Sequence, residues 1–232
     1  MKLTLPHKWK MSSDKARALQ KQLASQISRT PQLGRVRYVA GVGVHVRDQI
    51  GRAAAVVLDY NTLKPVDMAT AIYPVTFPFK PNLIAFRDAP VLLEALARLE
   101  IKPDLFIADG HGIAHPRQLG FASHIGVLTN IPTIGCSRAS LGEPDEELGA
   151  TRGCHSFIRN GNDEIIGASV RTQTDLPPLY VSIGHRVDLE TSIKFVLSAS
   201  RHDLFPEAVR LARRNSRILG KVPKLLQNGY TQ

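Results

Sequence analysis

Residues 104–117 carry the strongest structural signal in the chain and read DLFIADGHGIAHPR. The run up to Ala108 predicts a short buried strand of the kind found in parallel sheets. The strand ends in Asp109, and the glycines at positions 110 and 112 allow a ligand to approach the backbone closely. A carboxylate at a strand tip can bind a divalent cation, although the same residues would also form a tight turn with an N-capping aspartate. The residues alone leave both interpretations open.

The segment before this stretch predicts a helix followed by strands. Ser12 precedes apolar residues that recur at helical spacing. Residues 36–46 and 53–60 predict two strands joined by a short turn, which favours an antiparallel hairpin, and residues 66–73 predict a weaker third strand. Pro90 predicts the first turn of a second helix, because a proline there loses no hydrogen bond.

The segment after the stretch alternates strands and helices. The predicted strands are 133–137, 165–172 and 179–183, and the predicted helices are 118–128, 188–200 and 206–217. This order predicts an α/β fold with a mixed central β-sheet flanked by helices. Because strand ends in such folds meet at one edge of the sheet, carboxylates at those ends are expected to converge there.

Length and composition set broader limits. The chain has 232 residues, of which 43% are hydrophobic, and this predicts a single domain over residues 1–232, with 1–10 and 221–232 loosely held. A formal net charge of +10 favours a polyanionic partner such as nucleic acid, with a merely basic protein as the alternative. Two cysteines and the lack of a long apolar run predict a cytoplasmic protein without a membrane span.

The motifs resemble those of the endonuclease V family, nucleases that cut nucleic acid beside deaminated adenine. The matching segments, in family order, are 77–81 (FPFKP), 86–88 (FRD), 109–117 (DGHGIAHPR), 119–120 (LG), 122–124 (ASH), 131–135 (IPTIG), 184–187 (GHRV) and, in part, 204–211. The resemblance implies a ribonuclease H-like fold. It also implies hydrolysis of a phosphodiester near inosine in DNA or RNA, with Mg²⁺ or Mn²⁺ held by carboxylates.

The resemblance assigns roles in the reaction residue by residue. Asp109 matches a metal-binding aspartate, and Asp88 stands where the family has a metal-binding glutamate. Arg138 stands where the family has a lysine near the scissile phosphate, and a guanidinium presents a planar fork in place of a point charge. His185 matches a histidine near the reaction centre, where it would handle a proton or contact phosphate.

One metal ligand of the family is missing. The family reads Ala-Gly-Val-Asp-Val on the first strand, whereas residues 40–44 read AGVGV, and Gly43 has no side chain to coordinate a metal. Three interpretations stay open: a site that binds nucleic acid without efficient cutting, compensation by a neighbour, or ordinary activity on another substrate. His45 is the candidate neighbour because it shares a strand face with Gly43, although it could also be an ordinary strand histidine.

The resemblance also implies how a damaged base is recognised. Residues 78–81 match a wedge that enters the duplex, in which Phe79 would stack on a base and Lys80 would meet phosphate. The alternative is a proline-stiffened loop with Phe79 buried. The matching pocket for the base comprises Asn82, Leu83, Ile84, Gly110, His111 and Gly112. Asn82 replaces a family glycine, and asparagine tolerates left-handed backbone angles better than most residues.

His115 and Arg117 are further family matches for nucleic-acid contact, and a structural role is equally open for both. Three functions compete. The first is an inosine-directed endonuclease whose magnesium-dependent cleavage is weak or lost because of Gly43. The second is a catalytically inactive nucleic-acid-binding relative, and the third is a scaffold protein that kept only the fold. A monomer is favoured.

Overall fold

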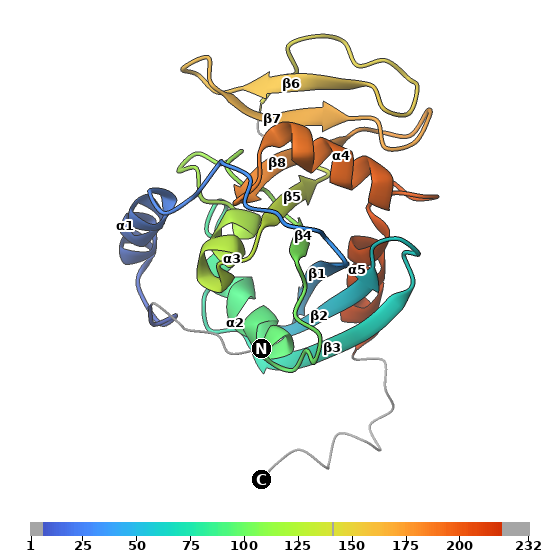
Figure 1. The fold of residues 1–232 in the computed structure, drawn as a ribbon. Coiled ribbons are helices and arrows are strands. Elements are labelled where there is room, and N and C mark those ends of the chain that lie inside the picture. The colour runs from blue at the N-terminus through green and yellow to red at the C-terminus, as the bar shows by residue number, and fades with distance from the viewer. Residues whose placement is uncertain (1–6, 141, 220–232) are drawn as a thin grey trace.

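The computed structural model describes residues 7–140 and 142–219, in which eight strands form one mixed sheet (Figure 1). The sheet order is β3-β2-β1-β4-β5-β8-β7-β6. The strands are β1 (Tyr38–Arg47), β2 (Ile50–Asp59), β3 (Pro65–Pro74), β4 (Leu105–Asp109), β5 (Thr133–Ser137), β6 (His155–Arg159), β7 (Ile165–Val170) and β8 (Leu179–His185). β1 pairs antiparallel with β2 and parallel with β4, so the predicted hairpin and the mixed sheet are confirmed.

The described part of the chain has five helices, of which α2 to α5 pack on the sheet and α1 packs against α3 (Figure 1). They are α1 (Ser13–Ala24), α2 (Ile84–Ala97), α3 (Phe121–Thr129), α4 (Leu189–Ala199) and α5 (Glu207–Ile218). The apolar residues of α2 and α3 form one core with one face of the sheet, and those of α4 and α5 form a second core with the other face. Each central strand therefore sends alternate side chains into two different cores.

Two glycines bring α5 unusually close to β1. A Cβ atom at Gly41 would overlap the backbone of Ala208, and one at Gly43 would lie 3.2 Å from the backbone nitrogen of Arg213. Both glycines share the strand face that points away from Ala40 and Val42, which belong to the core under α2 and α3. Small residues on this face of β1 therefore set the position of α5 over the strand end.

Several predicted boundaries are wrong. Pro90 lies inside α2, which begins at Ile84, six residues before the predicted first-turn proline. The predicted helix 118–128 begins only at Phe121, after Gly120 in extended backbone. β6 was not predicted at all, because its pattern of alternately exposed and buried residues covers only five positions.

The ends of the chain are described only in part. Of the segments predicted to be loosely held, residues 1–6 and 221–232 lie outside the described residues. Within residues 7–10, Trp9 packs edge-on against Phe86 with ring centroids 6.3 Å apart, and the rings of His7 and Trp9 also meet edge-on, with centroids 4.4 Å apart. No helix within residues 7–140 and 142–219 has the length and apolar character needed to cross a membrane.

Candidate nucleic-acid and metal site

A cavity of about 270 Å³ opens beside Asp109, at the end of β4. Its lining includes six residues that the sequence assigned to the site: Asn82, Ile84, Asp109, Gly110, His111 and His115. Its volume lies just below that of pockets for drug-sized ligands, roughly 300 Å³ and above, which suits a group of the size of one nucleobase. We call this cavity the turn pocket.

The glycine turn that forms one wall of the turn pocket lies directly on β8. The backbone nitrogen of Gly112 donates to Ser182 Oγ at 2.8 Å, and that of Ile113 donates to the carbonyl oxygen of Ile183 at 2.7 Å. A Cβ atom at Gly112 would overlap that carbonyl oxygen. Only glycine therefore allows the turn to seat against the strand.

The predicted wedge is an exposed loop between β3 and α2. Phe79 at its tip is 63% exposed, so the alternative of a buried Phe79 is wrong. The guanidinium of Arg87 lies 5.1 Å from the centre of the Phe79 ring, and Lys80 beside it is partly buried. Phe77 anchors the base of the loop, since it is buried against Phe86 with ring centroids 5.7 Å apart. With Arg87 over one side of the ring, the exposed remainder of Phe79 is available to stack on a base.

Asn82 fixes the junction between the wedge and the turn pocket. Its φ of 62° is left-handed, as predicted from its tolerance of such angles. Its carbonyl oxygen accepts three hydrogen bonds, from Gln20 Nε2 at 3.0 Å, from His115 Nε2 at 3.0 Å and from Arg117 Nη2 at 2.8 Å. Arg117 Nε also donates to Gln20 Oε1 at 2.6 Å. In this arrangement His115 and Arg117 hold the turn in shape.

Gln20 is a site residue that the sequence reasoning missed. It is buried and faces the site from α1, one helical turn after Ala16. A polar side chain on the buried face of an amphipathic helix was the available signal, because such a group requires hydrogen-bond partners.

The histidines of the turn pocket are neutral at physiological pH. Burial lowers the pKa of His111 to about 4 and that of His115 to about 4. A neutral imidazole carries one donor and one acceptor, which suits the polar edge of an uncharged base better than a phosphate. His124 is fully buried against His7 and Phe86, and burial lowers its pKa to about 3.

Asp109 is paired with an arginine of α5. Its Oδ2 accepts a hydrogen bond from Arg213 Nη1, with the two side chains 26% and 19% exposed, respectively. Burial raises the pKa of Asp109, and the charges of Arg213, Arg217 and Arg138 oppose that rise. Arg138, which follows β5, thus lies near enough to Asp109 for its charge to act on that carboxylate. Arg213 lies in the predicted helix 206–217 but was not assigned to the site.

Gly43, which has no side chain to offer a metal, lies on the face of β1 that α5 covers. The backbone of Ala212 and Arg213 occupies the space next to Gly43, with Ala212 C 3.3 Å from a Cβ built there. His45, two residues further on, is partly buried, and its pKa is lowered by burial and then by the charges of Arg217, Arg52 and Arg47. A side chain surrounded by three cations is poorly placed to bind a fourth.

Asp88 is held by its own neighbour in the sequence. It is buried in α2, and Arg87 Nε donates to its Oδ1 at 2.5 Å while Arg87 Nη2 donates to its Oδ2 at 3.1 Å. Burial raises the pKa of Asp88, and Arg87 opposes the rise. Each of the two candidate metal-binding aspartates therefore forms an ion pair with a different arginine.

This arrangement does not fit a divalent cation. Magnesium prefers clustered oxygen ligands, and no group of three or more His, Cys, Asp or Glu side chains within residues 7–140 and 142–219 could hold a metal ion. The carboxylate best placed for one, Asp109, already has a guanidinium against its oxygen. A metal could reach it only after Arg213 moved away.

His185 lies at a different level of the sheet. It pairs with Thr133, which in turn pairs with Phe106 of β4. Asp109 is three residues further along β4, which corresponds to about 10 Å. His185 Nδ1 accepts from the backbone nitrogen of Ser28 at 3.3 Å, and burial lowers its pKa to about 4. The structure thus brings Asp109 and Arg138 together but leaves His185 apart from them.

Comparisons with known proteins agree with the motifs. The family model described as Endonuclease V matches residues 21–214. The endonuclease V of Roseiflexus castenholzii is 42% identical over 212 residues, which cover 91% of this chain and 95% of that protein. The crystal structure of the Streptomyces avermitilis endonuclease V matches with a TM-score of 0.87 at 38% identity, covering 95% of this chain and 98% of that one.

A further solved structure carries a nucleic acid. It is the Ciona intestinalis endonuclease V in complex with a 24mer DNA containing an inosine followed by a ribo-adenosine. It matches with a TM-score of 0.80 at 28% identity and covers 90% of this chain and 97% of that one. Together with the sheet order, these likenesses confirm the predicted ribonuclease H-like α/β fold.

Proposed function

The chain belongs to the endonuclease V family, and on that premise we propose that it recognises inosine in DNA or RNA through the turn pocket and the Phe79 wedge. One observation carries this proposal. Six residues assigned from the family motifs line a single cavity of nucleobase size, next to an exposed aromatic ring. Extruding a base costs a few kcal/mol, and stacking on an aromatic side chain returns about 1–3 kcal/mol.

The proposal includes weak or lost cleavage. Members of the family are typically metal-dependent nucleases, and Mg²⁺ or Mn²⁺ is the proposed cofactor of any cleavage that remains. Gly43 supplies no ligand, and Arg213 is paired with Asp109. The same ion pair favours a second candidate function, in which the protein binds inosine-containing nucleic acid without cutting it. Cytoplasmic location and a monomeric state remain predictions.

Cleavage of labelled oligonucleotides with and without inosine, in Mg²⁺ and in Mn²⁺, tests the proposal. We expect little cutting by the parent in Mg²⁺. Gly43→Asp combined with Arg213→Ala should increase cutting at least about tenfold, the lower end of losses seen when the partners of metal ligands are removed. Gly43→Ala combined with Arg213→Ala is the matched control, because it places the same Cβ against α5 but adds no carboxylate.

Two outcomes would contradict the proposal. Robust parental cutting in Mg²⁺ would show that the site works without a ligand at position 43. Equal affinity for inosine-containing and inosine-free strands would remove the recognition function, whether or not the chain cuts.

A further inference from the structure

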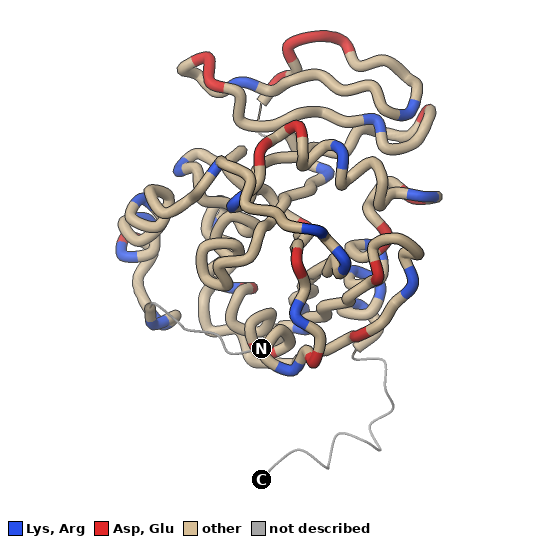
Figure 2. The backbone as a smooth tube through the Cα atoms, in the orientation of Figure 1, with Lys and Arg blue, Asp and Glu red and all other residues tan. Residues whose placement is uncertain are grey.

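Five arginines surround a second cavity, on the α5 side of Asp109. This cavity of about 310 Å³ is lined by Arg138, Arg210, Arg213, Arg214 and Arg217, together with Asp203, Phe205 and Ile218. We call it the arginine pocket. Four of the five arginines come from α5, and the basic residues along that helix can be followed as blue stretches in Figure 2. The fifth, Arg138, follows β5.

The charge in this pocket is only partly neutralised. Arg213 pairs with Asp109, and Arg210 pairs with Glu207 at 2.5 Å. Arg138, Arg214 and Arg217 form no ion pair with a carboxylate of residues 7–140 or 142–219. The five guanidinium groups thus face three carboxylates, which are those of Asp109, Glu207 and Asp203. Arg138, Arg214 and Arg217 are exposed, and this excess of positive charge favours an anionic ligand.

One aromatic ring holds the pocket together. The guanidinium of Arg213 lies 4.3 Å from the centre of the Phe205 ring, and that of Arg138 lies 5.6 Å from the same centre. Phe205 itself is buried. Stacking on a fixed ring restricts the planar groups of two arginines that come from different elements, so that their donors are ordered before a ligand arrives.

We propose that the arginine pocket binds phosphates of the nucleic-acid backbone directly, with Arg213 taking the place of a divalent cation beside Asp109. The proposal rests on the proposed function in one respect, namely that the ligand is a nucleic acid. Guanidinium groups bind phosphate oxygens with paired, charge-assisted hydrogen bonds and need no metal to bridge them. Arg213 cancels the negative charge of Asp109, which would otherwise repel a phosphate.

Salt-titrated binding in the absence of a divalent metal tests this proposal. The full chain is titrated against a labelled inosine-containing duplex, and against its adenine counterpart, in EDTA and then in Mg²⁺. We expect the affinity in EDTA to equal that in Mg²⁺ within twofold. The logarithm of the affinity should fall with the logarithm of salt concentration by about 0.9 for each phosphate contacted.

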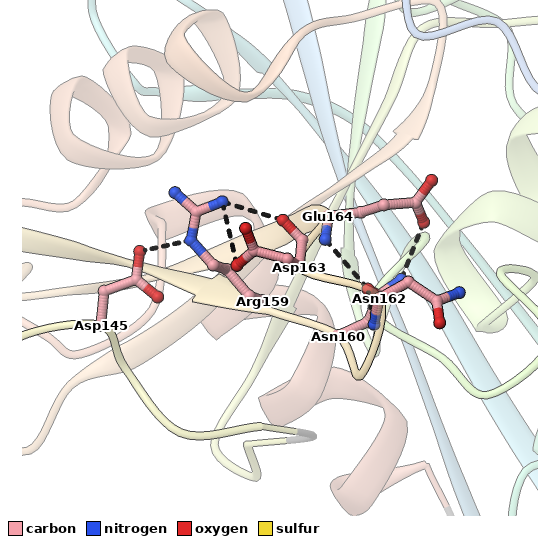
Figure 3. A network of polar contacts seen from close by, with 6 residues as sticks. All are labelled: Asp145, Arg159, Asn160, Asn162, Asp163 and Glu164. Carbon is pink, nitrogen blue, oxygen red and sulfur yellow. Dashed lines mark hydrogen bonds and ion pairs between the residues drawn. The ribbon is translucent and has the colours of Figure 1, made fainter.

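Variants locate the contacts. Arg217→Ala should lower the salt slope by about 0.9, and Arg214→Ala with Arg217→Ala by about twice as much. The control is Arg159→Ala, which also removes one positive charge but lies on β6, at the opposite edge of the sheet from β3. Figure 3 shows Arg159 between Asp145 and Asp163, with Nε 2.9 Å from Asp145 Oδ2. Thermal denaturation confirms that each variant is folded.

The outcomes separate this inference from the proposed function. Binding that disappears in EDTA, or a salt slope that Arg217→Ala and Arg159→Ala change equally, would overturn the arginine pocket as the phosphate site. Arginine-dependent binding with equal affinity for the inosine and adenine duplexes would support the pocket and overturn inosine recognition.

Discussion

The turn pocket and the arginine pocket lie on either side of Asp109, yet they are built from opposite kinds of chemistry. The turn pocket is made largely of backbone groups, glycines and neutral histidines, and the carbonyl oxygen of Asn82 accepts hydrogen bonds from His115 and Arg117. The arginine pocket is made mainly of charged side chains, four of its five arginines coming from α5, and it has more cations than anions. The first is suited to the shape of an uncharged base, and the second to the charge of a backbone.

The difference predicts where substitutions will be tolerated. The turn pocket depends on close backbone packing, in which a single added carbon collides with β8. The arginine pocket depends on long side chains that can be exchanged without moving the backbone. Gly43 is an exception on that side, because a Cβ there would lie 3.2 Å from the backbone nitrogen of Arg213.

The largest effect is expected from Gly112→Ala. Its Cβ would overlap the carbonyl oxygen of Ile183, and we expect the free energy of unfolding to fall by about 3 kcal/mol, the upper range for overpacked sites. Urea denaturation measures it. Gly34→Ala is the matched control, because nothing lies within 4 Å of a Cβ at Gly34, and should change stability by no more than about 0.5 kcal/mol. A tolerated Gly112→Ala would mean that the turn is not seated on β8.

A smaller loss is expected from Arg213→Ala on the other side of the site. It leaves Asp109 partly buried without its partner, and we expect a loss of about 2 kcal/mol, less than the 3–5 kcal/mol of fully buried pairs. Adding Asp109→Asn should restore part of the loss, because no buried charge is then left unpaired. A double variant no more stable than Arg213→Ala in urea denaturation would show that the ion pair contributes little.

The two pockets should also respond differently to pH. His111 and His115 have folded-state pKa values of about 4, below the ordinary 6.5. The unfolded chain therefore binds more protons between these values. Stability present above pH 6.5 is lost as the pH falls towards 4, by at most about 1.4 kcal/mol per pH unit for each histidine.

Urea midpoints at pH 7, 6 and 5 measure this loss, and His111→Asn should reduce its slope. Arginines keep their charge throughout this range. The salt slope of nucleic-acid binding should therefore stay constant over the same pH values. A midpoint independent of pH would show that the histidines are not protected from protonation.

The smallest effect is expected at Asn82. Its φ of 62° is easier for glycine than for any residue with a Cβ, so Asn82→Gly should leave stability within about 0.5 kcal/mol of the parent, while Asn82→Ala should lose about 1 kcal/mol. Both keep the carbonyl oxygen that accepts three hydrogen bonds. Thermal or urea denaturation of the two variants separates the cost of the left-handed backbone from the effect of losing the side chain. Equal stabilities of Asn82→Gly and Asn82→Ala would show that the backbone conformation at position 82 carries no such cost.

Much of the fold can be predicted from the sequence, but some elements are predicted better than others. The apolar strand before Asp109, the hairpin of β1 and β2 and the exposed Phe79 follow from local patterns and family motifs. Pro90 misled the prediction because a proline inside a helix removes one hydrogen bond, which tertiary packing of α2 can offset. The short β6 gives too few residues for its alternation to be recognised.

The candidate site can be predicted less completely than the fold, because its residues come from distant parts of the chain. Arg213 is separated from Asp109 by more than a hundred positions in the chain, and no local pattern connects them. Gln20 meets Asn82 for the same reason, through the packing of α1. The motif assigns His185 to the reaction centre, whereas strand register pairs it with Thr133 at the start of β5, and Arg138 follows the end of that strand. Sequence motifs identify residue types, whereas register and helix placement decide which of them meet.

The three hydrogen bonds accepted by the carbonyl oxygen of Asn82 restrict the motion of the wedge loop. Because donors from α1 and from the segment after the glycine turn converge on this single atom, the loop that carries Phe79 is anchored at its root. Little conformational entropy is left to lose when the ring enters a stack of bases, so more of the stacking energy is available for binding. Phe79 would then keep its position on binding, and the DNA or RNA would deform to accommodate the ring.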